Sequence, residues 1–179
     1  MLNCWKSPVP FLLRPTQDRD FKPVHGEACL PLSPHPGAFG VQRKHHVHEG
    51  VDLYCPAGTA VCAVEQGTTV AIIPFTGPEA DPPSPWWQNT WAVLVEGESG
   101  VVVYGELFKP NRGVGELIRQ GEEVGAVKQV LLKDKGYSMS MLHLELHELG
   151  TRTTFDWINE RPKSLLDPTP FLESASPRL

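Results

Sequence analysis

The chain has 179 residues, with 16 basic against 21 acidic side chains and a formal net charge of -5. This length is enough for one domain with a sizeable core. The acidic balance and the lack of a basic run argue against nucleic acid or an anionic membrane as the main partner. No apolar stretch of the sequence approaches the roughly 18 residues that a membrane span needs.

The N-terminal residues include a short apolar piece that Pro8 and Pro10 interrupt. No small-residue cleavage site follows this piece, so the sequence predicts no signal peptide. We therefore expect the chain to be cytoplasmic as made. Export by another route or phage-associated release are the alternatives that would bring it to a cell wall.

Prolines and glycines punctuate the whole chain, with 18 of the former and 16 of the latter. The proline share is about twice the usual value of roughly 5%, and such punctuation favours short strands and loops over long helices. The cysteines Cys4, Cys29, Cys55 and Cys62 form no CxxC pair, which argues against a cysteine-ligated zinc. We expect buried or incidental thiols, with one disulfide as the alternative.

The chain divides by pattern into a lead-in, a β-rich body and a looser end. Residues 1–38 show no sustained period and predict an extended lead-in that wraps the domain, with room for one short strand. After residue 147 the sequence predicts a short helix and a proline-anchored tail. Between them lie short β-branched-rich runs separated by Gly, Pro or Asn turns, the pattern of an antiparallel sheet system. These predicted strands are 51–55, 59–64, 68–75, 90–97, 100–107, 122–127 and 140–146.

The predicted fold class is therefore all-β, an antiparallel sheet sandwich or hybrid with long loops and a short C-terminal helix. The body is expected over 39–172, with 173–179 as a tail. Between two predicted strands lies a proline-rich insertion, 76–90, that carries Trp86 and Trp87. These two rings either wall a groove or pack against the body.

Two separated pieces of sequence carry potential metal ligands. His48 and Asp52 stand four residues apart at the start of a predicted strand, and Asp52 lies between apolar Val51 and Leu53. Side chains alternate between the two faces of a strand, so Asp52 points away from its apolar neighbours. In the strand "MLHLEL" the same alternation places Met141, His143, Glu145 and His147 on one face. His143 can thus meet His48 and Asp52, and imidazole and carboxylate groups are zinc ligands.

The segment before the strand of Asp52 contains several histidines, so more than one of them could be the metal ligand. His45 and His46 stand beside His48, and clusters of this kind are commonly no more than solvated. Two-residue alternation favours His48 with Asp52. His45 or His46 would instead have to swing towards the groove.

The stretch "FGVQRKHHVHEGVDLYCPAGTAVCAVEQGTTV" (39–70) resembles the lysostaphin/LytM-type zinc endopeptidases, whose pattern is FG and Arg, then HxGxD, then a PxGTxV hairpin. "VVVYGEL", "IRQGEEVGAV", "MLHLEL" and "DPTPFL" follow in the order of that family's later motifs. The resemblance implies a groove over an antiparallel sheet and one Zn²⁺ held by His48, Asp52 and His143. It also implies cleavage of peptide bonds in bacterial cell-wall peptidoglycan.

Two positions depart from the family pattern. Met141 stands where the first histidine of HxH is expected, and Glu106 where the histidine of YGHL is expected; in the family these histidines orient the zinc-bound water and stabilise an oxyanion. Met141 offers only a weak thioether acceptor. Glu106 has two readings, an altered general base or a fourth metal ligand that closes the site.

Two further side chains on the strand of His143 could support it. Glu145 or His147 could orient a ligand as an outer partner of the metal. His147 lies four residues, about 13 Å, along the strand from His143. We expect it to be a surface histidine.

The leading hypothesis is a zinc metalloendopeptidase with peptide or peptidoglycan in its groove. The alternative is a catalytically inactive zinc-binding domain that recognises a cell-wall or protein partner. A carrier or scaffold module is a third reading, and the lack of a lysine at an exposed hairpin tip argues against it.

Overall fold

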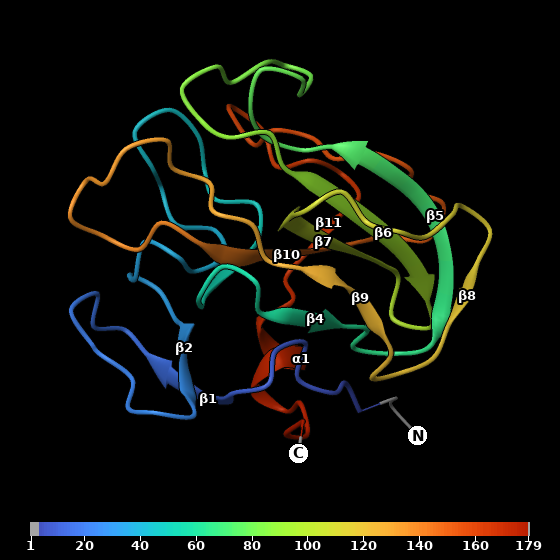
Figure 1. Ribbon diagram of the computed structural model, residues 1–179, viewed down its shortest axis with the longest axis horizontal. Helices are drawn as coiled ribbons and strands as arrows, with labels where there is room; N and C mark the ends of the chain where they lie inside the picture. The colour runs from blue at the N-terminus through green and yellow to red at the C-terminus, as the bar shows by residue number, and fades with distance from the viewer. Residues whose placement is uncertain (1–3, 179) are drawn as a thin grey trace.

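The computed structural model describes residues 4–178. Most of its strands form one twisted antiparallel sheet, in which β3 (Val51–Tyr54) also pairs with β10 (Met141–His147). Figure 1 shows this sheet curving across the molecule. The path of neighbouring strands is β11 (Leu165–Leu166), β10 (Met141–His147), β7 (Val101–Leu107), β6 (Trp91–Gly97), β5 (Gly67–Pro74) and β8 (Leu117–Ile118).

Two small sheets and one short helix complete the fold. β1 (Leu12–Thr16) and β2 (Glu27–Pro31) form a parallel pair, and β4 (Ala60–Cys62) and β9 (Glu123–Ala126) form an antiparallel pair. Helix α1 (Thr169–Glu173) lies near the C-terminal end. With five residues it is far too short to cross a membrane, and the described residues form no other helix.

The predicted alternation of side chains is what builds the core. Leu142, Leu144 and Leu146 of β10 all lie in the main hydrophobic cluster and are fully buried. On β7, Val102 and Tyr104 join the same cluster, whereas the neighbouring Val101 and Val103 pack on the opposite face with Ala92 and Leu94 of β6. The polar residues of β10 are left on that second face.

The all-β class and the C-terminal helix are confirmed, and each of the seven predicted strands overlaps an observed one. The lead-in holds two strands rather than the single short one expected. Its Trp5 and Val9 are buried in the main core, and Trp5 stacks on Phe171 at a ring separation of 4.8 Å. All four cysteines are free thiols, so the alternative of a disulfide is not realised.

Candidate metal centre

His48, Asp52 and His143 come together where β3 and β10 pair. The register places Asp52 directly opposite His143, and His48 enters from the loop before β3. His48 Nε2 lies 3.2 Å from both His143 Nδ1 and Asp52 Oδ1. His143 Nδ1 lies 2.8 Å from Asp52 Oδ1. All three side chains are buried, so the site lies within the fold and is not part of a solvated surface cluster.

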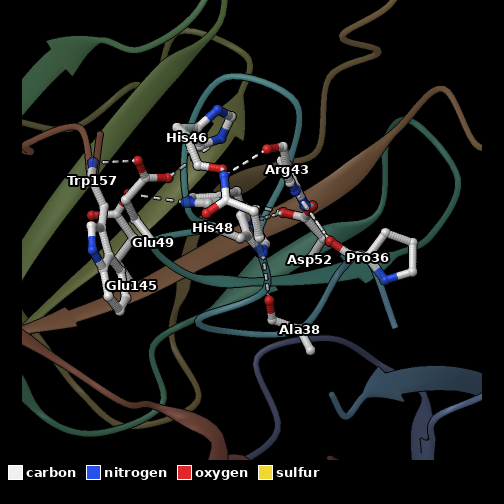
Figure 2. Close-up of polar contacts among 11 residues, drawn as sticks. Pro36, Ala38, Arg43, His46, His48, Glu49, Asp52, Glu145 and Trp157 are labelled. Carbon is white, nitrogen blue, oxygen red and sulfur yellow. Dashed lines mark hydrogen bonds and ion pairs between the residues drawn. The ribbon is translucent and has the colours of Figure 1, made fainter. Parts of the chain in front are cut away.

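Each histidine is oriented through its outward ring nitrogen. Nδ1 of His48 donates to the carbonyl oxygen of Ala38 at 2.9 Å, a contact visible in Figure 2. Nε2 of His143 lies 2.9 Å from a carboxylate oxygen of Glu145. When the outward nitrogen carries the proton, the inward nitrogen presents a lone pair, and this arrangement is the usual one for metal-ligating histidine.

The spacing of the three inward atoms fits a tetrahedral metal. Zinc–nitrogen and zinc–oxygen bonds of about 2.0–2.1 Å put neighbouring ligand atoms roughly 3.3 Å apart, close to the separations of 2.8–3.2 Å found here. Two imidazoles and one carboxylate also form a donor set that zinc accepts. His48, Asp52 and His143 can therefore hold one Zn²⁺ and leave a fourth position for another group.

The charges around the site favour a cation at its centre. Burial alone would raise the pKa of Asp52, but His48, His143 and Arg43 together hold it well below its usual value. Burial alone would lower the pKa of His143, but its bonds to Asp52 and Glu145 raise that pKa to about 10. Two ionised carboxylates thus flank the His143 imidazole, and this arrangement favours a proton or a metal ion between them.

The loop before β3 is fixed at several points so that His48 and Asp52 stay in place. Arg43 donates to the other Asp52 oxygen at 2.5 Å and to the Pro36 carbonyl at 2.8 Å, as Figure 2 shows. On its outer side the loop is held by Trp157, whose backbone N–H donates to Glu49 at 2.8 Å. Arg43 is the arginine of the FG-and-Arg pattern noted in the sequence.

Gly50, between the candidate ligands His48 and Asp52, allows β3 to approach β10 closely. A Cβ placed on it would lie 2.5 Å from the carbonyl oxygen of Leu144 and 2.9 Å from Nε2 of His143. Real side chains do not tolerate such distances. The central glycine of the "HEGVD" motif is thus required by packing against the candidate ligand itself.

A β-bulge sets the direction of Glu106. The register between β6 and β7 shifts between Trp91 and Val93, and Leu107 packs with Tyr104 in the main core although it lies three residues further on. Glu106 is the residue at which β7 accommodates the bulge, with a φ of 65°. This left-handed value is rare for residues other than glycine. Bulges of this kind re-aim side chains near functional sites. Here the bulge turns Glu106 away from the core cluster.

Glu106 is buried and bonded through one carboxylate oxygen. The hydroxyls of Thr76 and Thr90 donate to Oε2 at 2.8 and 2.7 Å. Burial raises the pKa of Glu106, and the threonine bonds and nearby His143 only partly offset this. Its immediate neighbour Gly105 is paired with His143 across the sheet, and the charges of His143 and Asp52 act on the pKa of the Glu106 carboxyl. Its two threonine partners could not have been identified from the sequence motif.

The remaining predicted residues, Met141, His46, Trp86 and Trp87, contribute no atom to the cluster of candidate metal ligands. Met141 is half-buried at the start of β10, opposite Tyr54. His46 is not brought to the metal-binding atoms; its Nε2 lies 3.8 Å from a carboxylate oxygen of Glu49 instead. Trp86 is exposed and packs edge-on against Trp87, with ring centroids 6.2 Å apart.

The expectation of a surface position for His147 is wrong. Its side chain is fully buried, with Nε2 2.7 Å from Glu145 Oε2 and Nδ1 3.0 Å from Ser164 Oγ. Alternation assigned it to the correct face of β10, but nothing local in the sequence shows that the segment 148–164 returns to cover that end of the strand. The same segment lines a hollow of about 630 Å³, which contains none of the candidate metal ligands.

The sequence matches no described protein family and no curated protein. Solved structures share the fold. A candidate peptidase M23 from Pseudomonas aeruginosa matches with a TM-score of 0.50 and 16% identity over 96% of this chain, which spans about half (51%) of that protein. CbpA from L. salivarius REN matches with a TM-score of 0.50 and 24% identity, covering 76% of this chain and 84% of its own.

The catalytic domain of the antimicrobial peptidase lysostaphin from Staphylococcus simulans matches at the same level. Its TM-score is 0.50 and its identity 21%, over 77% of this chain and 90% of that domain. The chain therefore has the fold of M23-type peptidases, and identities of 16–24% carry the comparison no further than the fold.

Proposed function

We propose that this chain is a zinc-dependent metalloendopeptidase-like domain directed at peptide bonds of bacterial cell-wall peptidoglycan. The observation that carries the proposal is the convergence of three ligand atoms, from His48, Asp52 and His143, within a buried site. The fold shared with an M23-type peptidase and with the lysostaphin catalytic domain supports the choice of reaction. It also supports the choice of a peptide as the substrate.

Within this proposal Glu106 is the general base. A metal at the site would supply Lewis-acid polarisation of a carbonyl and a more acidic bound water. Glu106 has the properties of a proton acceptor for that water: its pKa is raised by burial, and Thr76 and Thr90 hold only one of its oxygens. A carboxyl group whose pKa is raised towards neutrality is suited to general acid–base catalysis.

The test is cleavage of peptidoglycan and of a glycine-containing peptide by zinc-loaded protein. Glu106→Gln is expected to lower the rate by about 10²–10⁴-fold, the usual contribution of a general base, while zinc stays bound. Glu96→Gln is the matched control, because Glu96 lies on the same sheet but pairs with Arg152 at the surface. If wild-type protein with bound zinc cleaves neither substrate, the peptidase proposal is wrong.

A second candidate is a catalytically inactive zinc-binding domain that recognises a cell-wall or protein partner. Met141 favours it, since a thioether cannot donate a hydrogen bond to an oxyanion, and the loss of one such donor costs about 10²–10³ in rate. The expected result is then retention of the zinc-loaded protein on insoluble peptidoglycan without release of peptide fragments. Release of fragments by wild type would exclude this candidate.

A further inference from the structure

A line of buried side chains continues from the candidate metal centre towards segment 148–164. Glu145 lies between two imidazoles, with Oε1 2.9 Å from Nε2 of His143 and Oε2 2.7 Å from Nε2 of His147. Nδ1 of His147 then lies 3.0 Å from Oγ of Ser164. Glu145 and His147 are both buried, with His147 at 0% exposure, so water has no access to replace these bonds at His147.

The chemistry of the groups fixes the proton positions along this line. An ionised carboxylate only accepts hydrogen bonds, so both imidazoles must donate to Glu145 from Nε2. Burial alone would raise the pKa of Glu145, but the bonds from His143 and His147 lower it to about 2. A lone pair on Nδ1 of His147 can accept the hydrogen bond that the Ser164 hydroxyl donates.

Ser164 is itself held firmly at the end of the line. Its carbonyl oxygen accepts a hydrogen bond from the backbone N–H of Glu148 at 2.8 Å. The next residue, Leu165, begins β11 and pairs directly with His147. The backbone at Ser164 is therefore held beside the end of β10, within reach of His147.

We propose that His147 and Ser164 are positioning residues for the metal site, which act on His143 through Glu145. His147 fixes the Glu145 carboxylate, and the carboxylate fixes the ring of His143 so that Nδ1 points at Asp52 and His48. The proposal rests on the zinc site proposed above. Outer partners of metal-ligating histidines of this type contribute strongly to affinity.

The test is a zinc titration against a competing chelator on the full chain. His147→Leu keeps the bulk of the side chain but leaves Glu145 without its second donor, and it is expected to weaken zinc binding by roughly 10- to 100-fold. His147→Gln keeps an N–H donor towards Glu145 and should recover most of that loss. Ser164→Ala should weaken binding less than His147→Leu does.

Ser99→Ala is the matched control for Ser164→Ala. The Ser99 hydroxyl also serves a buried carboxylate, that of Glu65, but in contact with Trp5 and away from the metal centre. The Ser99→Ala variant is expected to have a lower melting temperature and an unchanged zinc affinity. A merely structural role for the buried line would make Ser164→Ala behave in the same way.

Nitrogen-15 NMR of the metal-free protein gives a readout that does not depend on zinc. The expected spectrum has the His147 proton on Nε2 in wild type, and a changed His143 ring signal in Ser164→Ala. Unchanged zinc affinity in Ser164→Ala, with an unaltered His143 signal, would overturn the positioning role even if His147→Leu does not fold. Wild-type protein that binds no zinc at all would instead refute the proposed metal site, and the His143 signal would still decide whether the line orients that ring.

Discussion

Gly50→Ala tests whether the contact between β3 and β10 determines the geometry of the site. The added Cβ would lie 2.5 Å from the Leu144 carbonyl oxygen and 2.9 Å from the Nε2 atom of His143. The carbonyl belongs to the paired backbone of β10, which cannot move away without disturbing the sheet. Overpacking of this kind costs about 1–3 kcal/mol. For a chain of this size that cost corresponds to a fall in melting temperature of roughly 2–12 °C.

The loss of zinc affinity should exceed what the loss of stability explains, because the clash displaces the ligand ring itself. We expect a roughly tenfold or greater weakening, measured by chelator competition well below the melting temperature. Gly113→Ala is the matched control, since the nearest atom to its Cβ would be the flexible Glu116 carboxylate at 3.2 Å. A Gly50→Ala protein with the melting temperature and zinc affinity of wild type would refute the steric reasoning.

Substitutions at three further positions test other features of the molecule. Glu106→Gly should be more stable than Glu106→Ala by up to about 1 kcal/mol in denaturant unfolding, the reverse of the usual order in strands, because the φ of 65° disfavours any side chain. Burial raises the pKa of Glu65, although bonds from Ser99 oppose this. The stability that the protonated Glu65 contributes is therefore lost as pH rises above the ordinary glutamate pKa of about 4.3 and through the raised folded pKa. Glu65→Gln should accordingly gain stability relative to wild type as pH rises through this range, measured by unfolding curves. Met141→His adds an imidazole two residues from His143 on the same strand face and should raise the peptide cleavage rate by about 10²-fold if hydrolysis is the function; an unchanged rate would show that Met141 does not limit turnover.

The body of the fold could be predicted because its information is local. Alternating apolar residues and Gly or Pro turns mark β5, β6, β7 and β10 within the sequence itself. By contrast, β8 and β11 have two residues each and exist only through their partners, β5 and β10. The parallel pair of β1 and β2 is likewise a product of pairing, so the lead-in showed no pattern that predicts it.

The residues of the candidate site likewise divide into those that the local sequence predicts and those whose placement depends on distant contacts. Asp52 and His143 followed from strand alternation, because β3 and β10 are regular where they pair, and His48 followed from its spacing of four residues before Asp52. Glu106 could not be oriented by that rule, since strict alternation would place it with Tyr104 on the core face and only the bulge turns it away. His147 was assigned to the correct face but to the wrong environment, because its burial depends on the distant Ser164.

The charge balance of the site leads to a prediction about zinc and pH. In the metal-free protein the pKa of His143 is raised to about 10, from an ordinary histidine value of about 6.5. The stabilisation from its charged ring is therefore fully present below pH 6.5 and is lost as pH rises towards 10. Zinc requires the deprotonated ring, so at pH 7.5 its binding must displace this proton.

Zinc affinity should accordingly rise about tenfold for each pH unit between 7 and 9. Calorimetry in buffers of different ionisation enthalpy should detect close to one proton released by His143 for each zinc bound. His143→Ala should bind zinc weakly and without this proton release. A wild-type protein that binds zinc tightly with no proton release at pH 7.5 would show that His143 is neutral before the metal arrives. Another cation would then have to balance Asp52 and Glu145, and Arg43, which already bonds to Asp52, is the side chain placed to do so.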